Sequence, residues 1–98
     1  EHTDGLVAAE TIRMIEAQGQ NPWFIGAGFY RPHCPYIAPS KYFDRVPLDQ
    51  VRLVPLQEGE MNIAPKWAYF TNPANWGMSE KQRREGMQAY FASILFLD

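Results

Sequence analysis

Three closely spaced prolines constrain the middle of the chain more than any other feature. Pro32, Pro35 and Pro39 lie within residues 31–39. Proline lacks an amide donor and has a fixed φ, and it pushes the residue before it towards extended conformations. From Arg31 onward the chain therefore cannot stay in a hydrogen-bonded ladder. We predict a stiff segment here, called the proline loop, with the neighbouring elements arranged around it.

The segment before the proline loop has the pattern of a buried strand. Residues 23–30 form an apolar run of strand length without polar alternation. Such a run is typical of a strand covered on both faces of a parallel sheet. Gly26 and Gly28 weaken a strand interior, which indicates that another backbone or a ligand comes close on that face. We therefore predict a buried strand that ends at the proline loop.

A helix is predicted on the N-terminal side of this strand. Thr3 or Asp4 can cap a helix that runs to about Gln18, and Gly19 can stop it. Apolar residues recur at helical spacing along it: Val7, Ala8, Ile12 and Ile15. A helix followed by a buried strand is half of a βαβ unit, which predicts an α/β fold. The expected order of elements is helix, strand, long loop and helix.

The last helix begins with a recognisable signal. Ser79 and Gln82 have the spacing of a capping box, in which each side chain bonds the other residue's backbone. Apolar residues then follow at helical spacing and predict one buried face: Met87, Tyr90, Phe91, Ile94 and Leu95. The sequence therefore predicts an amphipathic helix at the C-terminal end.

The long connection between the proline loop and the last helix contains weaker signals. Residues 39–44 indicate a helical turn that Ser40 could cap, with Tyr42 or Phe43 directed inward. Residues 51–54 suit a short edge strand or an extended connection. Residues 57–73 are expected to form a surface excursion, where three aromatic residues either pin the loop to the core or form an exposed patch: Trp67, Tyr69 and Phe70.

His33 is the candidate functional residue of the proline loop. In open α/β sheets, ligands bind beyond the carboxyl ends of the strands, and His33 follows such an end. A histidine can donate or accept a proton near neutral pH. The alternative is that His33 only hydrogen-bonds a neighbouring loop.

Two segments resemble one enzyme family. Residues 28–43 read Gly-Phe-Tyr-Arg-Pro-His-Cys-Pro-Tyr-Ile-Ala-Pro-Ser-Lys-Tyr-Phe, which resembles a segment of the sulfatases, most closely the iduronate-2-sulfatase-like branch. Residues 89–98 are similar to the helix that follows it in that family. The resemblance implies an alkaline-phosphatase-like sandwich with a mainly parallel sheet. Residues 1–98 would then be a partial sulfatase catalytic domain, a single unit incomplete at both ends.

The resemblance also implies an activity and the roles of two residues. A sulfatase is a sulfuric ester hydrolase, here expected to act on a carbohydrate such as a glycosaminoglycan. His33 matches the family's active-site histidine beside the sulfate group, so it is expected to be catalytic and substrate-binding. Arg31 stands where lysine is common and is the second candidate for substrate binding. Because arginine has a planar fork, Arg31 could instead anchor the loop through a carboxylate.

The cofactors implied by the resemblance have no residues in this chain. They are calcium and a formylglycine made from a cysteine in a Cys-x-Pro/Ala-x-Arg context. Cys34, the single cysteine, lacks that arginine, so we expect no nucleophile and no metal ligands within residues 1–98. The chain alone is accordingly predicted to be inactive.

The composition of the chain limits the classes of partner that we expect it to bind. The chain has 98 residues, 46% of them hydrophobic and 20% charged, with a net charge of -2. This gives no basic field for nucleic acid, and no apolar stretch approaches a membrane span. A sulfated small molecule or carbohydrate is the expected partner, and the isolated chain is expected to self-associate. The family resemblance suggests export to the periplasm, the extracellular space or the lysosome.

Two other functions fit the same sequence. A related phosphodiesterase or phosphonate hydrolase is the nearest enzymatic alternative. From a different class, a non-catalytic module could present Trp67, Tyr69, Phe70 and the proline loop to a protein or a glycan.

Overall fold

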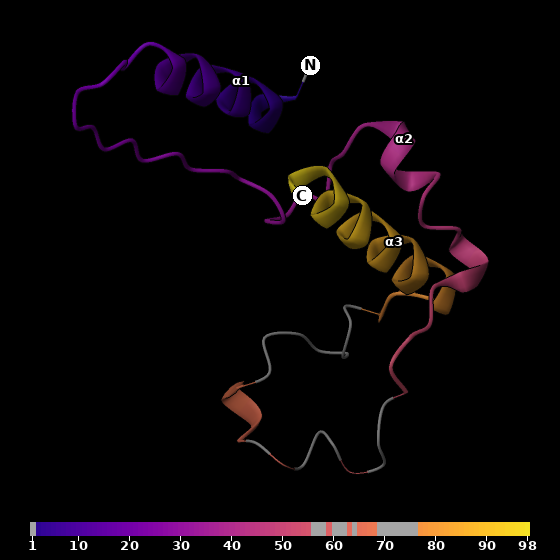
Figure 1. The fold of residues 1–98 in the computed structure, drawn as a ribbon. Coiled ribbons are helices and arrows are strands. Elements are labelled where there is room, and N and C mark those ends of the chain that lie inside the picture. Colours follow the sequence, from indigo (N-terminus) through magenta and orange to yellow (C-terminus); the bar gives the residue numbers. More distant parts are fainter. Residues whose placement is uncertain (1, 56–58, 60–62, 64, 69–76) are drawn as a thin grey trace.

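The structure of the chain is a computed structural model that describes residues 2–55, 59, 63, 65–68 and 77–98. Its elements follow in the order α1 (Thr3–Glu16), α2 (Ser40–Phe43), η1 (Leu48–Gln50), η3 (Lys66–Ala68) and α3 (Glu80–Leu97), where η denotes a 3₁₀ helix. α2 and η1 pack along α3, and the first turn of α1 lies near the last turn of α3 (Figure 1). The long C-terminal helix thus organises the chain.

Helix α1 forms close to its predicted place but is capped differently. It covers Thr3–Glu16 and its C-cap is Ala17, while Gly19 follows with a φ of 60°. The N-cap is His2, whose side chain makes no capping hydrogen bond. The prediction that Thr3 or Asp4 caps the helix is therefore wrong. Asp4 lies inside the helix, and its carboxylate bonds a distant part of the chain.

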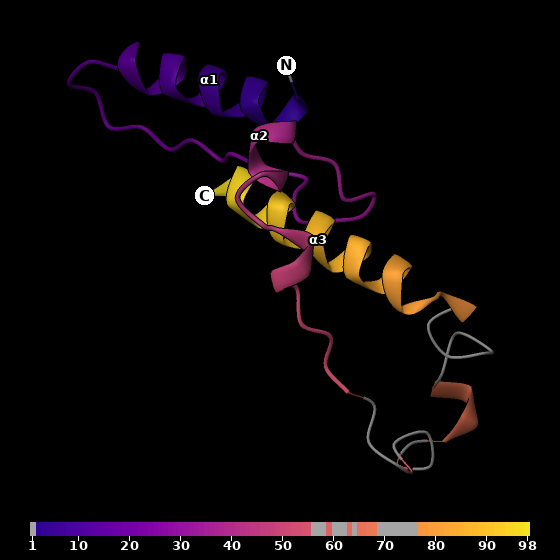
Figure 2. The same cartoon turned by 90° about the vertical axis from the view of Figure 1, so that its right-hand side faces the viewer.

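The segment predicted to be a buried strand is extended but unpaired. Residues 23–30 run back along α1 in both views (Figures 1 and 2). Within the described residues no strand is present, and Trp23 and Phe24 are 49% and 94% exposed. The prediction of a strand buried on both faces is thus not met in this chain, because a parallel strand needs neighbours to pair with. The α/β class and the alkaline-phosphatase-like sandwich stay predictions.

Short helical elements lie where a long loop was expected. α2 matches the predicted helical turn, but its N-cap is Pro39 and not Ser40. The ring of Tyr42 lies 5.4 Å from the ring of Phe96 on α3, which confirms that Tyr42 is directed inward. After η1 the chain forms an extended connection and not a strand over residues 51–54. Val51, at the start of this connection, is 3% exposed.

The start of α3 confirms the capping box. The hydroxyl of Ser79 accepts a hydrogen bond from the amide of Gln82 at 3.3 Å. The side-chain oxygen of Gln82 accepts in return from the amide of Ser79 at 2.8 Å. Two amides at the helix start, which have no partner inside the helix, are satisfied by this exchange.

The buried face of α3 is not the predicted one. Its fully buried residues are Ala92 and Ser93. The larger apolar residues of the predicted face are partly exposed: Met87, Tyr90, Phe91, Ile94 and Leu95. Polar side chains on α3 instead hold the segment that follows α2, since Gln88 donates to the carbonyl of Val46 at 2.7 Å and Arg84 donates to the carbonyl of Val51. Small residues and long polar ones together bring this segment against α3.

Of the three aromatic residues of the long excursion, the structure describes Trp67. Trp67 is 84% exposed on η3, whereas Tyr69 and Phe70 lie outside the described residues. The predicted choice between pinning residues and an exposed patch therefore stays open for those two. No helix in the described part of the chain combines the length and the apolar character that a membrane crossing needs.

Candidate active site

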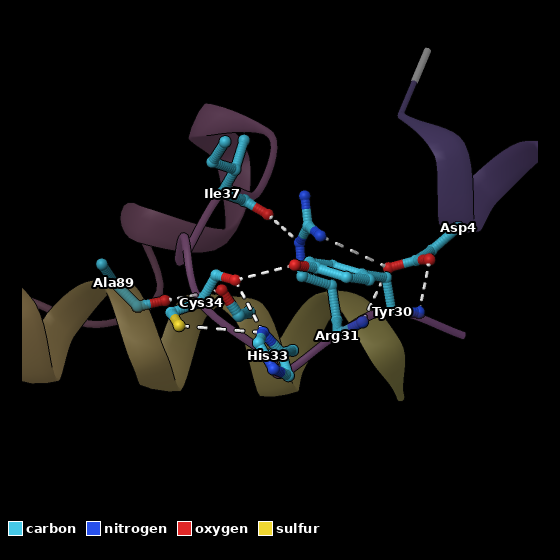
Figure 3. A network of polar contacts seen from close by, with 8 residues as sticks. Asp4, Tyr30, Arg31, His33, Cys34, Ile37 and Ala89 are labelled. Atoms are coloured by element: carbon cyan, nitrogen blue, oxygen red, sulfur yellow. Dashed lines mark hydrogen bonds and ion pairs between the residues drawn. The ribbon is translucent and has the colours of Figure 1, made fainter. Parts of the chain in front are cut away.

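The candidate site is a turn of residues 30–34, here called the histidine turn. It lies at the end of the extended segment, and the amide of His33 donates to the carbonyl of Tyr30 at 3.0 Å. Figure 3 shows the polar contacts of this turn together with Asp4 from α1 and Ile37 from the proline loop. The prolines predicted a stiff loop, and the hydrogen bond within the turn adds to its restraint.

The imidazole of His33 is held at one nitrogen. Nδ1 lies 2.7 Å from the carbonyl oxygen of Cys34. Because a carbonyl oxygen can only accept, Nδ1 carries the proton of this bond. The thiol sulfur of Cys34 is farther from Nδ1, at 3.7 Å. His33 is exposed, and Nε2 makes no hydrogen bond to any described residue. This arrangement presents Nε2 to a ligand.

Tyr30 reinforces the orientation of His33. Its hydroxyl donates to the same carbonyl of Cys34 at 3.0 Å, and its ring centroid lies 5.0 Å from that of His33. The oxygen of Cys34 thus accepts from both side chains and fixes them relative to each other. Sequence reasoning did not identify Tyr30 as part of the site, because it read Tyr30 only as the last residue of an apolar strand.

Arg31 is directed into the protein. Its Nε donates to the carbonyl of Ile37 at 2.5 Å, which closes the proline loop across its base. Its Nη1 lies 4.0 Å from a carboxylate oxygen of Asp4, and its side chain is 10% exposed. Of the two roles considered for Arg31, the geometry favours the anchor over direct substrate binding. His33 and Arg31 are thus close in sequence, but their side chains have different surroundings: that of His33 is exposed and that of Arg31 is directed into the protein.

Asp4 connects α1 to the histidine turn. Its two carboxylate oxygens accept hydrogen bonds from the amides of Tyr30, at 2.8 Å, and Arg31, at 3.1 Å. Asp4 is 5% exposed, although an aspartate in the first turn of a helix is usually on the surface. The sequence offered only a capping role for it, since no local pattern reveals a contact across 26 residues.

Tyr36 of the proline loop packs against α3. The rings of Tyr36 and Tyr90 lie 5.3 Å apart in an edge-to-face arrangement. A surface cavity of about 430 Å³ lies beside them, lined by residues that include Leu53 and Met87, but His33 is not among its lining residues. The described part of the site is thus a restrained and exposed histidine outside this cavity.

The described residues offer no metal centre. No three His, Cys, Asp or Glu side chains in this part of the chain are grouped so that they could hold an ion. Cys34 is an exposed thiol beside His33. Calcium and formylglycine stay expectations that follow from the family resemblance.

Comparison with known proteins gives three matches of one kind. A sulfatase of Formosa agariphila is 31% identical over 85 residues, which cover 81% of this chain and 17% of that protein. A choline-sulfatase of Rhizobium meliloti is 28% identical over 88% of this chain and 18% of its own length. An iduronate 2-sulfatase of Mus musculus is 26% identical over 91% of this chain and 19% of its own length.

The chain spans less than a fifth of the length of these curated relatives. No family model matches it, and no solved structure matches it. The three relatives nevertheless share one type of activity in their names, and each alignment includes most of this chain. These similarities support the assignment of the chain to the sulfatase family.

Proposed function

We propose that this chain is a segment of a sulfatase and that its histidine turn forms part of the sulfate-ester site of the full-length protein. The observation that carries the proposal is the geometry of His33, whose Nδ1 is fixed on the carbonyl of Cys34 while its exposed ring offers Nε2. The similarity to three sulfatases supports the class of substrate.

The tautomer of His33 suits proton donation to a leaving group. With Nδ1 already protonated, a second proton can only be bound at Nε2, and the resulting imidazolium can donate it to the departing ester oxygen. As the S–O bond of the ester breaks, the sulfuryl group passes to a nucleophile that another part of the full-length protein supplies. The leaving oxygen takes the proton from Nε2 and departs as an alcohol, and His33 returns to the neutral form with its bond to the carbonyl of Cys34 unchanged. General acid catalysis of this kind is typically worth about 10² to 10⁴ in rate.

Finer features of the function belong to the proposal as well. A carbohydrate substrate such as a glycosaminoglycan, calcium and formylglycine in the full-length protein, export, and the alkaline-phosphatase-like sandwich all follow from the family resemblance. When present, formylglycine would supply the nucleophile and calcium would bind the sulfate oxygens. The iduronate-2-sulfatase-like branch stays a prediction, because the choline-sulfatase matches at a similar identity.

Substrate selectivity tests this function against its alternatives. We expect the full-length protein to hydrolyse an aryl sulfate with a kcat/KM at least about tenfold above that for the matched aryl phosphodiester and aryl phosphonate. A tenfold preference corresponds to about 1.4 kcal/mol of transition-state discrimination. A preference for either phosphorus ester would support the related hydrolases instead. Absence of turnover on all three, with calcium supplied, would favour the non-catalytic module.

A further inference from the structure

A buried carboxylate that bonds two backbone amides is the least expected polar contact of the chain. Asp4 is 5% exposed, and both of its oxygens are used by Tyr30 and Arg31. Burying a carboxylate is costly unless hydrogen bonds and a counter-charge compensate for it. Here two amides provide the bonds, and the guanidinium of Arg31 provides the positive charge at 4.0 Å. Such an arrangement fixes a backbone more strictly than apolar packing does.

We propose that Asp4 is a positioning residue that sets the placement of His33. The inference rests on the proposed function, because it assigns to Asp4 a role in the sulfate-ester site. Asp4 itself touches no atom of His33 in any contact that the structure shows. It acts on the histidine turn from α1, through the backbone of the two residues that begin the turn (Figure 3).

The contacts form a continuous chain from Asp4 to the imidazole of His33. Asp4 holds the amide of Tyr30, whose carbonyl accepts from the amide of His33 at 3.0 Å. The hydroxyl of Tyr30 and Nδ1 of His33 meet at the carbonyl of Cys34. A shift of Tyr30 therefore moves both restraints of the imidazole together. A misplacement of about 1 Å in a catalytic group can cost about 10²-fold in rate.

Asp4 also acts through the closure of the proline loop. It lies on one side of the Arg31 guanidinium, and the carbonyl of Ile37 accepts from Nε on the other (Figure 3). With the charge of Asp4 removed, Arg31 loses one of its two described polar partners, and the base of the loop is held by the bond to Ile37 alone. Both routes predict a less well placed histidine and not merely a less stable helix.

The test is a double-mutant cycle in the full-length protein. Asp4→Asn keeps the size of the side chain but places an amide NH₂ where one of the two backbone N–H groups needs an acceptor, and it removes the charge that faces Arg31. We expect Asp4→Asn to lower kcat/KM for an alkyl sulfate by about 10- to 100-fold when His33 is present. In a His33→Ala background the same change is expected to cost less than about twofold, because there is no placed acid left to disturb.

A carboxylate on the same helix provides the matched control. Glu10 is exposed and pairs with Arg13 within α1, so Glu10→Gln is expected to leave kcat/KM within about twofold. The folded fraction of each variant is determined from its thermal melting curve, and kcat/KM is then calculated per folded molecule. This separates an effect on the position of His33 from an effect on stability. Asp4→Ser, which keeps one oxygen acceptor in the first helical turn, serves as a second variant if Asp4→Asn does not fold.

The outcomes separate this inference from the function on which it rests. A folded Asp4 variant with kcat/KM within about twofold of the parent, in a protein whose activity does depend on His33, would overturn the positioning role alone. Equal losses in the two His33 backgrounds would also overturn it, since Asp4 would then act independently of the histidine. If His33→Ala itself has no effect, the proposed site fails and this inference fails with it.

Discussion

Replacement of His33 by alanine in the full-length protein is expected to lower kcat/KM for an alkyl or sugar sulfate by about 10² to 10⁴. The physical reason is the loss of Nε2, the ring nitrogen that no described residue engages and that can donate a proton to a departing oxygen. The stability should change little, because His33 is exposed and loses one side-chain hydrogen bond, typically worth about 0.5 to 1.5 kcal/mol. Steady-state kinetics and thermal melting of the same preparations measure both effects.

The second histidine of the chain is a matched control for this experiment. His2 lies at the start of α1, where its ring is 5.6 Å from that of Phe96, and none of the contacts that the structure shows for it involves the histidine turn. His2→Ala is expected to affect melting more than catalysis. A loss of less than about fivefold for His33→Ala, far below the usual range for a general acid, would remove the catalytic role from His33.

The isolated chain is expected to show no sulfatase turnover at all, which is a larger effect than any single substitution. Its sequence contains no Cys-x-Pro/Ala-x-Arg segment, because Cys34 is its single cysteine and stands in another context. Calcium usually takes six to eight oxygen ligands, and no group of three or more acidic, histidine or cysteine side chains in the described residues is placed to hold a metal. Exposed apolar residues such as Phe24 and Ile12 also lack covering partners among these residues.

The assay compares the purified 98-residue chain with the full-length protein on one aryl sulfate, with calcium supplied to both. The full-length protein provides the positive control. Turnover by the isolated chain above that of a His33→Ala version of the same chain would contradict the account, because it would place a complete site within these residues.

Local patterns predicted the positions of α1, α2 and α3, but not the N-caps of α1 and α2. The capping box of Ser79 and Gln82 depends on residues three apart, and the structure contains both of its hydrogen bonds. Helix α1 and the short α2 likewise follow from spacing and from the prolines around them. These features are decided within one or two turns of chain, so the sequence contains all that is needed to read them.

Contacts between distant segments could not be predicted in the same way. Asp4 was predicted only as a candidate helix cap, and only the folded chain brings it to Tyr30. The last helix was predicted from its capping box and its apolar positions alone, yet its Arg84 side chain bonds the carbonyl of Val51. An apolar-periodicity argument also passes over Ala92, which is completely buried because its small side chain allows close approach.

The extended segment shows a further limit of local reasoning. Residues 23–30 have strand composition, but a strand exists only with a hydrogen-bonding partner, and no described segment pairs with it. The sequence also predicted that His33 lies in a stiff loop after this segment. His33 does lie in a restrained turn there, although the restraint comes from Tyr30 and Cys34 as well as from prolines.

The most direct test of the central claim is a crystal structure of the full-length protein with a non-hydrolysable sulfate-ester analogue. The measured quantity is the distance from Nε2 of His33 to the nearest oxygen of the sulfate group or its ester bridge. We predict a hydrogen bond of about 2.6 to 3.2 Å, with Nδ1 still bonded to the carbonyl of Cys34. An analogue bound with its sulfate group out of contact with the histidine turn would contradict the account.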